Sequence, residues 1–241
     1  MAKETYIFKR AEMKYMLTGS QRCALQEALS KYMIPDEFGK STICNIYYDT
    51  PDYRLIRRSL EKPCYKEKLR LRSYGPMAEP ESKVFLELKK KSDGVVYKRR
   101  LGLTDREAED CLASGAPLPR DAQIAREIDY FRELYGEIVP AMYICSDREA
   151  FFCKTDDTLR ISFDSAIRWR DYDVTLASHA YGAPLLAPDA SLMEIKLSSA
   201  MPLWLTHLLT ANGIYETSFS KYGSGYRAML SRDAERSVIC A

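Results

Sequence analysis

Charged residues alternate with apolar or small residues along many short segments of this chain, and most of these charges are positive. In the segment 65–72, Lys66, Lys68, Arg70 and Arg72 occupy every second position. Successive side chains of a β-strand point to opposite faces of a sheet, so the four cations are expected on one face. The same period of two recurs at six other places, and it predicts a sheet with one charged face.

The six other groups are Arg10, Glu12 and Lys14; Glu87 and Lys89; Lys98 and Arg100; Ser146 and Arg148; Arg160, Ser162 and Asp164; and Glu194 and Lys196. The opposite faces are apolar in several of them, as at Leu159, Ile161 and Phe163. One or two such strands would be typical of a half-exposed sheet. Seven favour a closed barrel, with the apolar faces packed against outer helices and the charged faces lining the interior. The expected fold class is α+β: a closed antiparallel eight-stranded β-barrel with helices packed outside.

The remaining patterns place the elements in order. Strands are expected at 6–17, 43–48, 64–74, 83–90, 95–103, 142–152, 158–167 and 192–197. Helices are expected from Thr18 through Met33 until Pro35, from a capping box at 104–107 to Gly115, at 124–135 before Gly136, at 202–212, and from about Gly225. Segment 53–60 is ambiguous. We expect residues 1–241 to form one domain.

Composition and motif content argue against several classes of function. The net charge is only +2, so nucleic-acid coating is not expected. Seven cysteines occur singly without any CxxC pair, which argues against disulfides or zinc and favours the cytoplasm. The first residues do not resemble a signal peptide, and no run approaches the ~20 apolar residues of a membrane helix. With only two histidines, imidazole acid–base chemistry and a histidine-rich metal site are not expected. The sequence also has no GxxxxGK[ST] loop and no GxGxxG fingerprint, so phosphates are not expected to be held by a P-loop or a dinucleotide fold.

The cations themselves indicate the ligand. Two like charges about 6 Å apart repel by roughly 3 kcal/mol at an effective dielectric constant of ~20, so an empty interior lined with cations would be unstable. We therefore expect a polyanion such as polyphosphate or a triphosphate. The inward carboxylates Glu12, Glu87, Asp164 and Glu194 neutralise part of the charge, and they are also suitable ligands for Mg²⁺ or Mn²⁺. Cations with such a metal are typical of phosphoryl transfer.

Ordered motifs across roughly 8–227 resemble the triphosphate tunnel metalloenzyme superfamily, and within it the catalytic domain of the vacuolar transporter chaperone polyphosphate polymerases. They are Phe8-Lys-Arg-Ala-Glu-Met-Lys-Tyr15, Asn45-Ile-Tyr-Tyr-Asp-Thr50, Leu69-Arg-Leu-Arg-Ser-Tyr-Gly75, Phe85-Leu-Glu-Leu-Lys-Lys90, Arg148-Glu-Ala-Phe151, Leu159-Arg-Ile-Ser-Phe-Asp164, Met193-Glu-Ile-Lys196 and Phe219-Ser-Lys-Tyr222. The resemblance implies that a triphosphate tunnel binds ATP and transfers its γ-phosphoryl to a growing polyphosphate chain.

The resemblance also implies residue roles. Phosphates would be held by Lys14, Arg70, Arg72, Lys89, Arg148, Arg160 and Lys221, and the divalent metal by Glu194. Further candidates for substrate binding are Arg10, Lys98, Arg100, Lys196 and Ser220, and further metal candidates are Glu12 and Glu87. For Glu12 and Glu87, metal ligation, water positioning and pairing with a cation remain open. Tyr47 and Tyr48 are expected to pack between barrel and helices.

Two departures qualify this reading. Arg10 stands where the superfamily's hydrolases carry the first glutamate of Glu-x-Glu-x-Lys, which favours the polymerase branch. Ser146 stands where eukaryotic members carry a tyrosine. A hydrolase of tripolyphosphate or nucleoside triphosphates, and a non-catalytic polyphosphate-binding module, are the alternatives.

Overall fold

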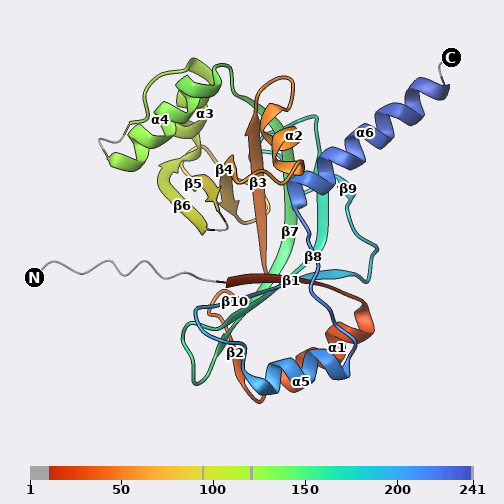
Figure 1. Ribbon diagram of the computed structural model, residues 1–241. Helices are drawn as coiled ribbons and strands as arrows, with labels where there is room; N and C mark the ends of the chain where they lie inside the picture. Colours follow the sequence, from red (N-terminus) through yellow and green to blue (C-terminus); the bar gives the residue numbers. More distant parts are fainter. Residues whose placement is uncertain (1–10, 94, 120–121, 240–241) are drawn as a thin grey trace, which may run out of the picture. The chain divides into compact units, whose positions relative to one another are not determined.

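The computed structural model describes residues 11–93, 95–119 and 122–239 as alternating strands and helices (Figure 1). The strands are β1 (Ala11–Leu17), β2 (Met33–Pro35), β3 (Ser41–Asp49), β4 (Tyr65–Tyr74), β5 (Lys83–Ser92), β6 (Val95–Thr104), β7 (Val139–Cys153), β8 (Arg160–Arg170), β9 (Ala183–Pro184) and β10 (Ser191–Leu197). The helices are α1 (Gly19–Leu29), α2 (Arg54–Leu60), α3 (Asp105–Ser114), α4 (Gln123–Tyr135), α5 (Leu203–Ala211) and α6 (Lys221–Ile239).

The strands form an antiparallel sheet that does not close. Its order is β1-β10-β8-β7-β3-β4-β5-β6, with β2 paired to β7 and β9 paired to β8. Within the described ranges, no pairing joins the two end strands, β1 and β6. The expected antiparallel α+β class is therefore confirmed, and the expected closed barrel is wrong. Alternation fixes which side chains share a face of each strand, but it carries no information on whether the first and last strands meet.

The chain divides into two compact units, each built from several separate stretches of sequence. Among the described residues, unit 1 comprises 11–41, 147–166 and 186–219. Unit 2 comprises the described parts of 42–146, 167–185 and 220–239. The unit boundaries at 146/147 and 166/167 fall inside β7 and β8. None of the helices in the described part of the chain is long and apolar enough to cross a membrane.

In unit 1, helices α1 and α5 cover one face of the strands (Figure 1). The core joins Leu25 and Leu29 of α1 and Leu205 and Leu209 of α5 to the apolar positions of the sheet. The sheet contributes Tyr15, Leu17, Leu159, Ile161, Phe163, Met193, Ile195 and Leu197. These are the positions that alternate with the charged ones, so the opposite face of the unit 1 strands carries the charges.

In unit 2, α3 and α4 cover one face of β3 to β6 in the same way (Figure 1). Ala108 of α3 and Ile128 and Phe131 of α4 pack on the strand positions Ile46, Leu69, Leu71, Val84, Leu86, Leu88, Leu101 and Leu103. Arg99 of β6 points to this helical side, where its Nε lies 3.1 Å from Glu127 Oε2 of α4. Its neighbour Arg100 belongs to the charged face.

Several element boundaries differ from the sequence-based expectation. Helix α1 ends at Leu29, and Met33 begins the short strand β2 instead of continuing the helix. The ambiguous segment forms α2, because the Asp49 carboxylate accepts hydrogen bonds from the N–H groups of Leu55 and Ile56 at its start. Helix α6 begins at Lys221, four residues earlier than expected. The Ser220 hydroxyl accepts the N–H of Gly223 and so caps this earlier start.

Candidate functional site

One buried carboxylate of unit 2, that of Glu87 on β5, is surrounded by four cationic side chains. Arg70 Nη2 of β4 lies 2.6 Å from Glu87 Oε2, and Arg72 Nε lies 4.0 Å from the same oxygen. From β6, Lys98 Nζ and Arg100 Nη2 lie 2.7 and 2.6 Å from Glu87 Oε1. The Glu87 residue is 1 % exposed. These five residues, here called the Glu87 cluster, carry a formal charge of +3.

Strand register brings this cluster together. Arg70 is directly opposite Glu87 in the β4–β5 pair, and Glu87 is directly opposite Arg100 in the β5–β6 pair. Directly opposed residues of an antiparallel pair lie on the same face with their Cβ atoms about 5 Å apart. Three neighbouring strands therefore deliver their charged side chains to one place.

The electrostatics of the cluster are dominated by the cations. Burial alone would raise the pKa of Glu87, but Arg70, Arg72 and Lys98 overcome this and hold that pKa well below its usual range. Partial burial lowers the pKa of Lys98 to about 8, with Glu87 opposing the shift and Arg100 adding to it. Glu87 is thus ionised at neutral pH, and its single charge leaves most of the cationic charge uncompensated within the cluster.

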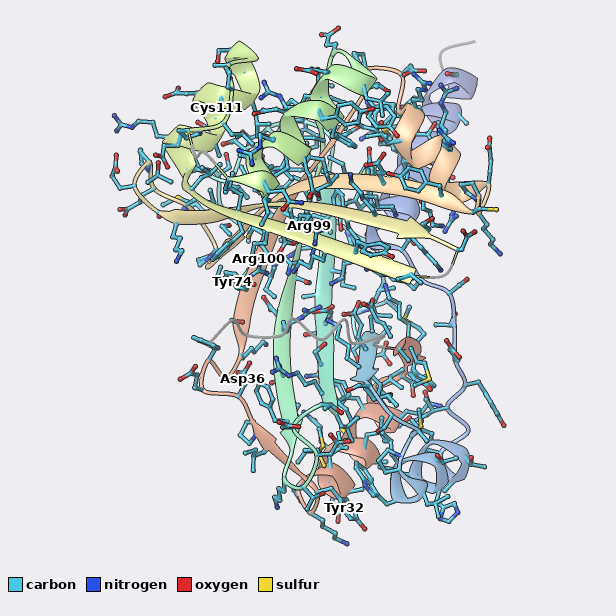
Figure 2. All side chains as sticks on the ribbon, turned by 60° about the vertical axis from the view of Figure 1, so that its left-hand side comes forward. Tyr32, Asp36, Tyr74, Arg99, Arg100 and Cys111 are labelled. Carbon is cyan, nitrogen blue, oxygen red and sulfur yellow. The ribbon has the colours of Figure 1, made fainter. Side chains whose placement is uncertain are left out.

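Polar neighbours hold the guanidinium groups in place. Arg72 Nε donates to Asn45 Oδ1 at 2.9 Å, and Asn45 Nδ2 donates to the Ile144 carbonyl at 3.1 Å. Arg100 Nη2 donates to the Tyr74 hydroxyl at 3.2 Å, and its guanidinium carbon lies 4.5 Å from the centre of the Phe85 ring. Figure 2 shows Arg100 and Tyr74 side by side, where β4 and β6 carry them. Fixed donors of this kind suit a ligand with several anionic oxygens.

Tyr47 of β3 lies on this charged face and, as expected, packs between the sheet and a helix. It is directly opposite Arg70 in the β3–β4 pair and stacks on Tyr222, with ring centres 4.6 Å apart. Burial would raise the pKa of Tyr47, but Arg70, Lys68 and Lys221 lower it to about 8. Tyr48, on the other face, does pack in the helix-covered core as expected.

The first turn of α6 also lies at this face of unit 2. Lys221 Nζ donates to the Ser146 hydroxyl at 3.4 Å, and Lys68 Nζ donates to the Ser220 hydroxyl at 3.1 Å. Gly225 packs so closely on β7 that a Cβ atom there would come within 2.4 Å of the Met142 sulfur. A larger residue at this position would have to displace the Met142 side chain for α6 to approach the strand so closely.

A buried hydrogen bond anchors the same turn. The Tyr222 hydroxyl donates to Asp49 Oδ2 at 2.8 Å, and Asp49 is fully buried. Because the Asp49 carboxylate also caps α2, one side chain connects α2 and α6 to β3. Sequence analysis did not identify this link, although the position of Asp49 directly before a turn and a short helix was a usable signal.

The charged face of unit 1 is organised around Glu194 of β10. Lys14 Nζ of β1 lies 3.4 Å from Glu194 Oε1, and Arg148 Nη2 of β7 lies 3.3 Å from Glu194 Oε2. Arg148 also donates two hydrogen bonds of 2.7 and 2.6 Å to the two oxygens of Asp164, which is fully buried. Lys196 Nζ lies 4.0 Å from Glu194 Oε2.

Two carboxylates of unit 1 lie near the same lysine. Glu12 Oε1 and Glu194 Oε1 lie 3.8 and 3.4 Å from the same lysine nitrogen, that of Lys14. Mg²⁺ commonly takes one or two protein carboxylates and completes its shell with water and phosphate oxygens. The residues described do not include a group of three or more side chains that could hold a metal alone. Glu12 and Glu194 would therefore hold a metal only together with phosphate and water ligands, and Glu87, with four cations around it, is the less suitable ligand.

The sequence-predicted site residues fall into the two faces. Unit 1 contains Glu12, Lys14, Arg148, Arg160, Glu194 and Lys196, and unit 2 contains Arg70, Arg72, Glu87, Lys89, Lys98, Arg100, Ser220 and Lys221. Arg160 is exposed, with its guanidinium carbon 4.5 Å from the centre of the Phe152 ring. Lys89 lies between Lys68 and Lys98 in the strand register. Arg10 lies outside the described residues.

Comparisons with known proteins identify relatives of this chain. The chain is 26 % identical over 221 residues to the vacuolar transporter chaperone complex subunit 4 of Trypanosoma brucei brucei, and 25 % identical over 232 residues to that of Trypanosoma cruzi. These alignments cover 77 and 81 % of this chain, but 28 and 29 % of the relatives. The chain thus spans less than a third of the length of these curated relatives.

A solved structure shares the fold. A protein of Bacillus halodurans, described as a candidate adenylate cyclase, superposes with a TM-score of 0.54 at 16 % identity, covering 88 % of this chain and 95 % of that one. At this identity the likeness concerns the fold alone. The family model of the VTC domain matches residues 9–230, which include both charged faces. The chain therefore belongs to the VTC domain family.

Proposed function

We propose that this protein is a metal-dependent polyphosphate polymerase domain, which transfers the γ-phosphoryl group of ATP to the end of a polyphosphate chain. The observation that carries the proposal is the Glu87 cluster, where four cations share one buried carboxylate. Such a surface is stabilised by a ligand of high negative charge density. Membership of the VTC domain family and the likeness to subunit 4 of the vacuolar transporter chaperone complex support polyphosphate as the ligand class.

The proposed reaction needs no protein nucleophile. A terminal phosphate oxygen of the acceptor chain attacks the γ-phosphorus of ATP, a new phosphoanhydride bond forms, and the bond between the γ-phosphorus and the β–γ bridging oxygen breaks. ADP leaves with that oxygen, so the polymer grows by one phosphate. Catalysis then depends on positioning and on neutralising charge, which cationic side chains provide.

The two faces have different proposed roles. Arg70, Arg72, Lys98 and Arg100 bind phosphate oxygens and are kept in position by Glu87. Lys89 and Lys221, with Ser220, extend this binding surface. In unit 1, Lys14, Arg148, Arg160 and Lys196 bind further phosphate oxygens. Glu194 and Glu12 would hold Mn²⁺ or Mg²⁺, which when bound neutralises charge on the phosphoryl group.

The test is incubation of the purified protein with ATP and Mn²⁺, followed by gel analysis of polymer length and an assay of free phosphate. Polymer formation that is lost in Glu194→Gln supports the proposal. Release of free phosphate without polymer would instead indicate a hydrolase of tripolyphosphate or nucleoside triphosphates. Tight, salt-sensitive polyphosphate binding without turnover would indicate a non-catalytic binding module.

Two further properties belong to the proposal. The trypanosomal relatives are described as subunits of a complex, and we propose that this chain also works with protein partners. We place it in the cytoplasm, where ATP is available and where the six free cysteines of the described chain would stay reduced. Nucleic acid is not proposed as a ligand, and competition between polyphosphate and single-stranded RNA would test this.

A further inference from the structure

The charged face of unit 2 continues beyond the Glu87 cluster as rows of lysines. Next to the row Arg70–Glu87–Arg100 comes the row Lys68–Lys89–Lys98, in which each residue is directly opposite the next across the strand pairs. The row after that opposes Lys66 of β4 to Lys91 of β5. Directly opposed like charges destabilise a sheet, so these rows need an explanation.

The outermost row has little local compensation. Lys66 is half-buried, and its Nζ donates to the Ser59 carbonyl at 3.2 Å. Burial lowers the pKa of Lys66, and the charges of Lys91 and Lys62 lower it further. Among the described residues, no carboxylate lies within ion-pair distance of Lys62, Lys66 or Lys91. The nearby pair of Lys90 with Glu67 belongs to the opposite, helix-covered face.

Lys62 is held in this group by an unfavourable backbone conformation. It follows α2 with φ of 55°, in the left-handed region that residues other than glycine and asparagine rarely occupy. Its N–H donates to the Ser59 carbonyl at 3.4 Å, the same oxygen that accepts the Lys66 ammonium. The turn thus brings the exposed Lys62 toward Lys66 and Lys91.

The length of these lysine rows along β4 indicates which ligand they bind. Side chains on one face of a strand repeat every two residues, so Lys66 and Arg70 are separated by about 13 Å along β4. A chain of three linked phosphates is shorter than this distance. It can contact only the inner rows, Arg70–Glu87–Arg100 and Lys68–Lys89–Lys98. A longer phosphate chain bound at the Glu87 cluster would reach the outer row.

We propose that Lys62, Lys66 and Lys91 form a distal subsite for polyphosphate, which binds phosphates of the polymer beyond those held by the Glu87 cluster. This inference rests on the proposed function, because it presumes that a phosphate chain occupies the inner rows. The lysine rows contain no aromatic side chain on which a base could stack, which favours polyphosphate over single-stranded nucleic acid. The subsite makes affinity dependent on chain length.

The test compares ligands of two lengths. Dissociation constants of tripolyphosphate and of a long-chain polyphosphate are measured by calorimetry for the wild-type chain and for Lys66→Gln/Lys91→Gln. The double variant is expected to bind the long chain about tenfold more weakly and tripolyphosphate unchanged, as expected for the loss of two partly exposed charge pairs. Without ligand, its Tm should rise, because the repulsion between the two lysines is removed.

The matched control is Lys83→Gln compared with the single variant Lys91→Gln. Both lysines are exposed on the charged face of β5, but Lys83 lies at the other end of the strand. Only Lys91→Gln should weaken long-chain binding. Equal losses for the two single variants, equal losses for both ligands, or a wild-type chain that binds RNA of the same phosphate number as tightly would overturn the subsite.

The subsite and the proposed function fail in distinguishable ways. If the wild-type chain binds both phosphate ligands and the double variant binds them equally well, the subsite is wrong and the proposed function stands. If the wild-type chain binds neither ligand, both are wrong.

Discussion

The charged faces of units 1 and 2 arise from the same period-two pattern but differ in charge balance. In unit 1, the carboxylates of Glu12, Asp164 and Glu194 accompany the cations Lys14, Arg148, Arg160 and Lys196, with Glu194 and Asp164 both engaged by Arg148. In unit 2, Arg70, Arg72, Lys98 and Arg100 share the single carboxylate of Glu87. Alternation therefore fixes the face on which a charge lies, and strand register decides which charges meet there.

This difference separates two tasks that phosphoryl transfer requires. A nearly balanced face that carries several carboxylates can hold a cation beside phosphate, whereas a face with excess positive charge binds the phosphate itself. In the proposed function, unit 1 performs the first task and binds some of the phosphates, and the Glu87 cluster of unit 2 provides most of the phosphate binding. Each of the following predictions tests whether the two faces differ in this way.

The largest effect is expected for Glu194→Gln in unit 1. Removing the carboxylate should lower polymer synthesis about 1,000-fold, since metal neutralisation of the phosphoryl group is worth several kcal/mol. Polyphosphate affinity should stay within about threefold, because every cation proposed to bind phosphate oxygens is left in place. Steady-state assays with ATP and Mn²⁺, together with calorimetry, measure the two quantities.

The control for this prediction is Glu149→Gln. Glu149 also belongs to unit 1, but it pairs with Arg22 of α1 on the helix-covered side. It should leave synthesis nearly unchanged. A Glu194→Gln variant that keeps its activity, or that loses affinity and activity in parallel, would erase the functional distinction between the faces.

Glu87→Gln in unit 2 should destabilise the fold by about 3 kcal/mol, because four cations would lose their shared buried partner. The pKa of Glu87 is held below its usual value. Its stabilising contribution is therefore complete above the pKa of an unfolded glutamate, about 4.3, and is lost as pH falls toward the lower folded pKa. Urea unfolding of both proteins between pH 3 and pH 7 measures the difference.

Glu127→Gln is the matched control for Glu87→Gln. Glu127 pairs with Arg99 of β6, the strand that also provides Lys98 and Arg100 to Glu87. The Glu127–Arg99 pair lies on the helix-covered side and is partly exposed. Its loss should cost under about 1 kcal/mol at every pH. Equal losses of unfolding free energy for the two variants would mean that Glu87 contributes no more to stability than an ordinary surface ion pair.

Tyr222→Phe tests the anchor of unit 2 and should cost about 1.5 kcal/mol of unfolding free energy, because the buried Asp49 loses one hydrogen-bond donor. Tripolyphosphate affinity should fall a few-fold, since Tyr222 fixes the helical turn that carries Lys221. Chemical denaturation and calorimetry measure both. Tyr226→Phe serves as the comparison, because Tyr226 lies in the same helix and its ring packs against Tyr53. A variant as stable as wild type would contradict the anchoring role of the hydroxyl.

The smallest effect is a pH dependence confined to unit 2. The pKa values of Lys98 and Tyr47 are both lowered to about 8, so between pH 7 and pH 9 the lysine loses its positive charge and the phenol gains a negative one. Both changes weaken phosphate binding, by about fivefold together. The double variant Lys98→Arg/Tyr47→Phe should not show this decline. Comparing the variant with wild type at each pH cancels the effect of the ligand's own titration. An identical pH profile in the two proteins would refute the assignment.

Much of the fold was readable from the sequence because strand alternation is a strong local signal. The charged positions of β4, β5 and β10 lie on the face that alternation indicated, opposite the helix-covered core. The end of α1 at Leu29 was missed because Tyr32 and Met33 continue a helical spacing, although Met33 pairs with Cys153 in β2. A tertiary strand pairing overrode the local pattern there.

The parts of the site that could not be predicted depend on register between distant strands. The meeting of Arg70, Glu87 and Arg100 requires the alignment of three strands, which alternation leaves undetermined. The position of Tyr47 beside Arg70 is likewise invisible without that alignment, although its packing against a helix was expected. Whether the sheet closes depends on cumulative twist over all strands, and no segment of sequence encodes it alone.

The cations of β4 have a consequence for folding as well as for binding. A slip of one residue in the pairing of this strand would turn Lys68 and Arg70 toward α3 and α4, and would expose Leu69. Misaligned chains would therefore bury unpaired charge, so these cationic side chains penalise incorrect pairing during synthesis and refolding. Neutralising them to probe substrate recognition would also relax the constraint that selects one alignment of the sheet.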